Sequence, residues 1–272
     1  MNISVWSTYF RDLAPEQSVD AFLEGGFRHM ELSDEDGSLL LERGQPQKVG
    51  REFRSFLDAR GFSVPQGHLK LRADLCRDAG AVDEFKRWLD LFYEIGIKAA
   101  VLHFGGYDLF VSYKELVEIR ANAISQLAEH VKGTDMFICL ENIRGCYCSH
   151  LLELIDAVGG DNMGICLDTG HLNLTAEKQS DFIHKAGGYL KALHIADNQG
   201  ATDQHLMPFG IGTVDWPDVM RALKETGYQG LFNFEIPGET SANVPLEVRK
   251  RKLKYIKTLA EFMLDMPCAQ PT

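Results

Sequence analysis

Residues Met163–Leu172 read MGICLDTGHL, an apolar run that ends in an acid and a histidine. Successive side chains of an extended strand point to opposite faces, so Ile165 and Leu167 share one face. Cys166 and Asp168 share the other. Large aliphatic residues suit packing against helices, and small or polar residues suit the inside of a closed sheet. We therefore expect a buried strand whose inner face ends in a carboxylate.

Short apolar runs of this kind alternate with amphipathic helical segments along the chain, as in Val82–Ile95, where aromatic and leucine residues recur at helical spacing. The eight runs are Ile3–Ser7, Phe27–Ser33, Phe62–Leu69, Ala99–Gly106, Met136–Ile143, Met163–Leu172, Leu190–Asp197 and Gly230–Glu239. Such alternation predicts a parallel sheet, and eight units favour closure into a (β/α)8 TIM barrel. We expect this α/β fold to cover residues 1–272 as a single domain. An open doubly wound sheet is the alternative.

The inner face of these runs ends in an ionisable residue at the carboxyl end of the strand. In Met136–Ile143, for example, Glu141 lies on the face opposite to Ile138 and Leu140. The residues expected at inner carboxyl ends are Glu31, His68, His103, Glu141, Asp168, His194 and Glu235. A barrel brings these ends together around one mouth, where the active sites of this fold lie.

Several buried carboxylates at one mouth would repel one another and lose their charge. A divalent cation removes this conflict and explains why histidines accompany the acids. Nitrogen and oxygen ligands without thiolate suit zinc, manganese or cobalt, with zinc or manganese favoured over cobalt. The expected metal ligands are Glu141, Asp168, His194 and Glu235. Additional ligands for a further ion are expected among His68, His103, His171, Asp203 and His205.

Other residues near the expected mouth suit contacts with a substrate. His68, His103 and His171 would bind substrate oxygens if they hold no ion. Arg144, three residues past Glu141, suits a hydroxyl or a phosphate, and Trp6 at the end of the first run would form a wall of the pocket.

Two further patterns are interpreted as structural. The basic tract 249–252 lies in the last amphipathic segment and is interpreted as a solvated helix face rather than a nucleic-acid patch. Cys146 and Cys148 form a lone C-x-C, which we interpret as packing rather than metal binding.

The excess of acidic residues bears on which kind of molecule the protein binds. The chain has 28 basic and 39 acidic residues and a net charge of -11. Such a surface repels phosphate backbones unless basic residues cluster, which counts against nucleic acid as a partner and favours a small carbohydrate. The start MNISVWSTYF lacks the pattern of a signal peptide, and no apolar run reaches the roughly 18 residues that a membrane span requires. We expect a cytoplasmic protein, and the sequence leaves its oligomeric state open.

Four phrases give the chain a family resemblance: C-L-E-N at 139–142, C-L-D-T-G-H at 166–171, H-I-A-D-N at 194–198 and F-E-I-P-G-E at 234–239. In their order and spacing they resemble the xylose-isomerase-like TIM barrel superfamily, particularly its sugar phosphate isomerase/epimerase group. In the ketose 3-epimerases of that superfamily one metal is held by Glu, Asp, His and Glu. The resemblance places these ligands at Glu141, Asp168, His194 and Glu235, with the two glutamates as the acid/base pair. The arginine that follows the metal histidine by about six residues in those epimerases is replaced by Gly200.

The chain is also similar to the endonuclease IV family, which cuts abasic DNA and binds three zinc ions in the same fold. The residues that match its ligand pattern in order are His68, His103, Glu141, Asp168, His171, His194, Asp203, His205 and Glu235. The resemblance as a whole implies a divalent-metal-dependent isomerase or epimerase that acts next to the carbonyl of a sugar, sugar phosphate or related polyol through an enediolate. A zinc phosphodiesterase on abasic DNA, a keto-polyol dehydratase and a non-catalytic binding module are the alternatives.

Overall fold

The structure is a computed structural model that describes residues 1–71, 73–75, 77–78, 80–105, 111–238 and 244–267. Gly106 and Glu239, at the ends of two expected runs, lie outside these residues. Each of the eight runs contains a strand, as the sequence predicts. The strands are β1 (Asn2–Val5), β2 (His29–Leu32), β3 (Ser63–His68), β4 (Ala99–Leu102), β5 (Phe137–Glu141), β6 (Met163–Asp168), β7 (Leu190–His194) and β8 (Leu231–Phe234).

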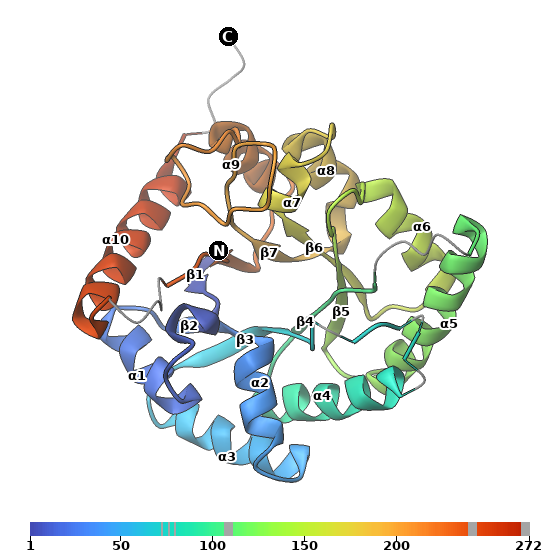
Figure 1. The fold of residues 1–272 in the computed structure, drawn as a ribbon, viewed down its shortest axis with the longest axis horizontal. Helices are drawn as coiled ribbons and strands as arrows, with labels where there is room; N and C mark the ends of the chain where they lie inside the picture. Colours follow the sequence, from blue (N-terminus) through green and yellow to red (C-terminus); the bar gives the residue numbers. More distant parts are fainter. Residues whose placement is uncertain (72, 76, 79, 106–110, 239–243, 268–272) are drawn as a thin grey trace.

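Helices surround the strands as an outer ring (Figure 1). The helices of the described residues are η1 (Ser7–Phe10), α1 (Pro15–Glu24), α2 (Asp34–Leu41), α3 (Pro46–Asp58), α4 (Ala81–Ile95), α5 (Tyr113–His130), α6 (Cys148–Val158), α7 (Thr169–Asn173), α8 (Gln179–Ala186), η2 (Gly187–Tyr189), α9 (Trp216–Glu225) and α10 (Leu246–Asp265). The first and last α-helices lie side by side, where Lys250 bonds Glu24 at 2.7 Å. In the described part of the chain, every helix is too short or too polar to cross a lipid bilayer.

The strands pair in parallel and in chain order, as a TIM barrel requires. One continuous sheet runs from β2 to β7, and β1 pairs with β8. Single parallel bridges, Trp6 with Glu31 and Ile195 with Phe234, join these two sheets. The barrel is therefore formed, but its hydrogen-bonded ladder is thinner at these two seams than elsewhere.

Two separate apolar clusters confirm the predicted directions of the strand side chains. The inner cluster consists of Ala99, Val101, Cys139, Cys166 and Ala192. The large cluster that includes the helices takes the alternate residues, among them Ile138, Leu140, Ile165 and Leu167. Small residues fill the barrel because its interior is narrow, which leaves the ends of the inner faces for polar groups.

The strand β6 ends before its predicted run does, because a helix begins there. β6 ends at Asp168, whose Oδ1 accepts the His171 backbone N–H at 2.6 Å and caps the short helix α7. A side chain in this position starts a helix because it satisfies an otherwise unpaired amide. His171, which the sequence places within the run Met163–Leu172, therefore lies on a helical turn beside Asp168 and not on the strand.

The interpretation of the tract 249–252 as a solvated face is wrong for Arg249. Its side chain is buried, and Nη1 and Nη2 donate to the two oxygens of Asp12 at 2.6 and 2.7 Å. Arg251 and Lys252 are exposed, as expected. A planar guanidinium tolerates burial when a carboxylate accepts two of its bonds, and here this pair ties α10 to the segment between η1 and α1.

Candidate metal centre

The strand ends place six predicted site residues around one mouth. His68, Glu141, Asp168 and His194 are the last residues of β3, β5, β6 and β7. His103 and Glu235 each lie one residue past β4 and β8. Of these six side chains, all except that of His103 are buried. The fold thus brings groups from a stretch of sequence between residues 68 and 235 into a single cluster.

Glu141 lies at the centre of this cluster. Its Oε2 is 3.2 Å from His68 Nε2 and 2.9 Å from His103 Nε2. Its Oε1 is 3.3 Å from the Nδ1 atoms of both His171 and His194. One carboxylate therefore joins the first two histidines to the second two.

Buried polar atoms without hydrogen-bond partners mark the place where an ion would fit. Among the described residues, these orphaned atoms include Asp168 Oδ2, His171 Nδ1, His194 Nδ1 and Glu235 Oε2. Ligand atoms from Glu141, Asp168, His194 and Glu235 all lie within 4.8 Å of one another. Unpaired buried groups are costly, and a shared cation would satisfy them together. The donor set of three carboxylates and one imidazole therefore fits the divalent metal predicted from the sequence.

A second group lies at the outer side of the first. Asp203 Oδ2 is 3.2 Å from both His171 Nε2 and His205 Nε2. Ligand atoms of these three residues also lie within 4.8 Å of one another. His205 has a φ of 47°, a left-handed backbone that is strained for a side chain other than glycine. Its Nδ1 lies 2.7 Å from the Glu235 backbone oxygen, and its ring is parallel to that of Trp6 at 6.1 Å. Trp6 therefore lies beside the cluster. Its role as a wall of the substrate pocket stays a prediction.

A third group consists of His68, His103 and Glu141. The structure thus arranges all nine residues of the predicted ligand pattern in three adjoining groups. Two of these groups share Glu141, and the third adjoins them through His171, whose Nδ1 lies 3.3 Å from Glu141 Oε1. Cys166 joins Glu141 and His194 in a fourth geometric group. Burial raises the pKa of the Cys166 thiol well above its usual range, which disfavours the thiolate that a metal would need.

Charges in the cluster shift the pKa values of its members. Burial is the largest single effect on the pKa of His68 and acts to lower it, but the hydrogen bond to Glu141 and the negative charges of Glu141 and Glu31 together raise this pKa to about 9. Burial likewise opposes protonation of His171 and His205, yet Asp168 and Asp203 bring their pKa values to about 12 and about 10.

The carboxylates shift in both directions. Burial raises the pKa of Asp168 to about 7. Burial also acts to raise the pKa of Glu141, but His103 and His194 hold it well below its usual range. Without an ion the site therefore holds its negative charge by keeping protons on the imidazoles, and a divalent cation would replace those protons.

Sequence reasoning missed the amides and hydroxyls that hold the ligands in place. Asn142 Oδ1 accepts the Asp168 backbone N–H at 2.7 Å, and Thr169 Oγ1 donates to Ala196 O at 2.7 Å. Both residues directly follow a predicted ligand, which is the signal that could have identified them. Glu31, expected at an inner strand end, has its Oε1 3.0 Å from His194 Nε2 and so orients this imidazole.

Arg144 lies at a small cavity next to the cluster. The cavity measures about 260 Å³ and is lined by residues including His103, Arg144 and His171. Arg144 is exposed, and no ion pair of its guanidinium is found within the described residues. The structure thus brings a cation within the same cavity as two predicted site histidines.

The family of the chain follows from comparison with known proteins. The family model of the xylose isomerase-like TIM barrel matches residues 19–266. The chain therefore belongs to the xylose isomerase-like TIM barrel family, as the sequence phrases predict.

Several of the relatives are named as sugar epimerases. The chain is 29% identical over 85 residues to L-ribulose-5-phosphate 3-epimerase UlaE of Salmonella paratyphi A, which covers 31% of this chain and 30% of that protein. It is 36% identical over 61 residues to fructoselysine 3-epimerase of Escherichia coli O157:H7, 22% of each chain. The matches thus span less than a third of the length of the curated relatives.

A solved structure of D-psicose 3-epimerase with D-tagatose from Clostridium cellulolyticum H10 covers 98% of this chain and 100% of its own. The TM-score is 0.82 at 17% identity. At this identity the similarity establishes the fold.

Proposed function

We propose that this protein is a divalent-metal-dependent epimerase or isomerase that acts next to the carbonyl of a sugar, sugar phosphate or related polyol. The observation that carries this proposal is the convergence of orphaned ligand atoms from Asp168, His194 and Glu235 with Glu141 in one buried group. Two of the curated relatives are named as 3-epimerases of sugars. Their named activities support a sugar or sugar derivative as the substrate of this protein. Zinc or manganese is the proposed metal, from the mixed nitrogen and oxygen ligands.

The proposed reaction moves one proton at a carbon next to the carbonyl. When bound, the metal would supply a positive charge that stabilises the developing enediolate. One of Glu141 and Glu235 would take the proton from carbon, and the electron pair of the C–H bond would pass into the enediolate. The other would return a proton, and delivery to the opposite face of the same carbon gives the epimer. Delivery to the neighbouring carbon gives the isomer, provided that the hydroxyl proton moves from the first enediolate oxygen to the second. His194 Nδ1 lies 3.3 and 3.2 Å from the two carboxylates, so both face one space.

The remaining predicted residues would position the substrate. The His103 and His171 imidazoles and the Arg144 guanidinium line one cavity, where they would bind hydroxyl or phosphate oxygens. Trp6 would form a wall of the substrate pocket, because its ring lies 6.1 Å from that of His205 and a 2.9 Å hydrogen bond from its Nε1 to Ile236 O holds it there.

Solvent deuterium exchange into a responsive sugar tests the assigned roles. We expect Glu141→Gln and Glu235→Gln each to slow exchange by about 100-fold or more, because general acid–base groups contribute at least that much. Glu129→Gln is the matched control, since Glu129 is exposed and pairs with Lys132 on the surface. Exchange at the wild-type rate in both site variants would refute the proposal.

The three ligand groups also favour a second candidate, a zinc phosphodiesterase that acts on abasic DNA. The net charge of -11 counts against it, because DNA binding requires a basic surface. Metal analysis of the purified protein separates the two: roughly three ions per chain and nicking of an abasic duplex would support the nuclease. Dehydration of a keto-polyol is a neighbouring chemistry at the same carbon, and product analysis in the exchange experiment would detect it.

A further inference from the structure

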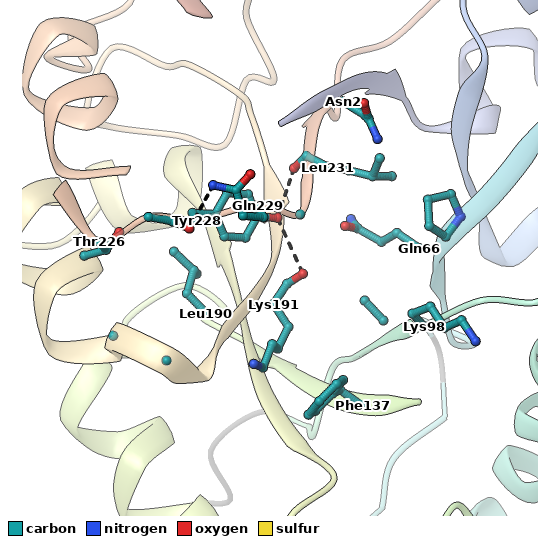
Figure 2. A pocket seen from close by; sticks show the side chains of 16 residues that line it. Asn2, Gln66, Lys98, Phe137, Leu190, Lys191, Thr226, Tyr228, Gln229 and Leu231 are labelled. Atoms are coloured by element: carbon teal, nitrogen blue, oxygen red, sulfur yellow. Dashed lines mark hydrogen bonds between the residues drawn. The ribbon is translucent and has the colours of Figure 1, made fainter. Parts of the chain in front are cut away.

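A second cavity lies at the opposite end of the barrel, at the amino ends of the strands. It measures about 430 Å³ and is lined by residues from β1, β3, β4, β5, β7 and β8 and from the turn before β8. Figure 2 shows Gln66, Phe137 and Lys191 around this space. Its volume lies within the range of small-molecule sites.

The charge of this cavity differs from that of the whole chain. Its lining residues include Lys98 and Lys191 and no aspartate or glutamate, although the chain has 39 acidic and 28 basic residues. Lys98 is paired with Asp135. Lys191 has no carboxylate partner among the described residues. The cavity therefore contains one cation that is available to a ligand.

A strand irregularity directs Lys191 into the barrel. In the pairing of β6 with β7, Ile165 is opposite Leu190 and Cys166 is opposite Ala192, so Lys191 is an extra residue. A side chain on Gly164 would lie only 2.7 Å from Lys191 Cγ, so the missing side chain there provides the space that the lysine fills. β-bulges of this kind redirect single side chains and are common next to binding sites. Lys191 Nζ lies 4.6 Å from the centroid of the Phe137 ring, which supports the cation without neutralising it.

Gln66 provides an independent sign of a ligand. This side chain is 1% exposed and lines the cavity from β3. Its Nε2 donates to Leu193 O at 3.2 Å, while its Oε1 has no hydrogen-bond partner within the described residues. A buried acceptor of this kind needs a donor, which a ligand in the cavity would supply.

We propose that this cavity binds a small carboxylate that carries a hydroxyl group on an aromatic or aliphatic body. The carboxylate would pair with the Lys191 ammonium, and the hydroxyl would donate to Gln66 Oε1. The apolar body would pack against Phe137, Leu190 and Leu231, which line the same space. This site lies outside the proposed catalytic centre and does not depend on the proposed reaction.

Isothermal titration of the metal-loaded protein with 4-hydroxybenzoate, benzoate and inorganic phosphate tests the site. We expect 4-hydroxybenzoate to bind and Lys191→Met to weaken its binding by about 10-fold or more, since a charge-assisted bond is lost. Lys191→Arg keeps the cation and should bind within about threefold of the wild type. Benzoate should bind more weakly than 4-hydroxybenzoate, and Gln66→Met should remove this difference.

Controls separate this site from the metal centre and from a folding defect. Lys132→Met, at an exposed lysine paired with Glu129, should leave the titration unchanged. Lys191→Met should retain the wild-type metal content and deuterium exchange, which also shows that it is folded. No binding of either benzoate at about 10 mM, or equal binding by Lys191→Met, would overturn the proposal. Phosphate binding as tightly as 4-hydroxybenzoate would overturn the assignment of an apolar body.

Discussion

The two ends of the barrel treat buried polar groups in different ways. At the carboxyl end, Glu141 contacts four histidines, and several ligand atoms still lack partners. At the amino end, Lys191 and Gln66 face a cavity whose lining has no aspartate or glutamate. The first arrangement suits a cation and the second suits an anion. Net charge of the whole chain therefore describes neither end, because the same strands separate opposite charges along the barrel axis.

The largest expected effect comes from removing one charge at the carboxyl end. Asp168→Asn keeps an oxygen that can cap α7, but it removes a carboxylate from the buried group. We expect deuterium exchange to fall by about 1,000-fold and bound metal to fall with it, because an incomplete ligand set loses its ion. Asp161→Asn is the matched control, since Asp161 is exposed just before β6. If Asp168→Asn kept full metal occupancy and full deuterium exchange, the carboxyl end of the barrel would not be the cation site that distinguishes it from the amino end.

A smaller effect is expected from changing Glu31, the carboxylate that contacts the proposed ligand His194. Glu31→Gln changes the carboxylate that orients His194 through Nε2, without removing any predicted ligand. Metal affinity should fall by about 10- to 100-fold, as is typical when the partner of a metal histidine is altered. Competition with a chromogenic chelator measures this affinity. Carboxylate binding at the amino end should be unchanged, and a parallel loss there would indicate that the two ends are not separate.

The smallest expected effect is a change in stability with pH. Rising pH should destabilise the metal-free protein and strengthen its stabilisation by metal. The pKa of His68 is raised to about 9, so its protonation stabilises the metal-free fold below about pH 6.5 and this contribution is lost as pH rises through 9. Metal binding needs the unprotonated ring and therefore strengthens over the same range.

Thermal unfolding at pH 6 to pH 9 (roughly the window between the unfolded and folded pKa values) measures both trends. The Tm of the chelated protein should fall by a few degrees, and the gain in Tm on adding zinc should increase. A zinc-dependent gain that stays constant across this range would contradict the prediction.

The barrel and most of the candidate site could be predicted because both depend on alternation within strands. Ile138 and Leu140 identify the outer face, and Glu141 then lies inside at the strand end. Closure of the sheet brings such ends together whatever the connecting loops do. The predicted roles of these residues as ligands, acids or bases stay predictions until metal and exchange are measured.

Features that break the alternation or depend on tertiary contact could not be predicted. Strict alternation would put Lys191 on the outer face, because Ala192 and His194 point inward, and only the pairing of β7 with β6 reveals the extra residue. Arg249 looked like one of four solvated basic residues, because its partner Asp12 is 237 positions away. Hydrophobic period and composition carry no information about either contact.

The extra residue in β7 has a consequence for how relatives of this chain should be aligned. Lys191 and His194 are three positions apart, an odd spacing that a regular strand would send to opposite faces. The irregularity is what lets both enter the barrel, one near each opening. A homologue that lacks one residue between them has a spacing of two, and a regular strand would then keep both groups on the inner face. A homologue that keeps the spacing of three but pairs regularly would turn one of the two groups outward.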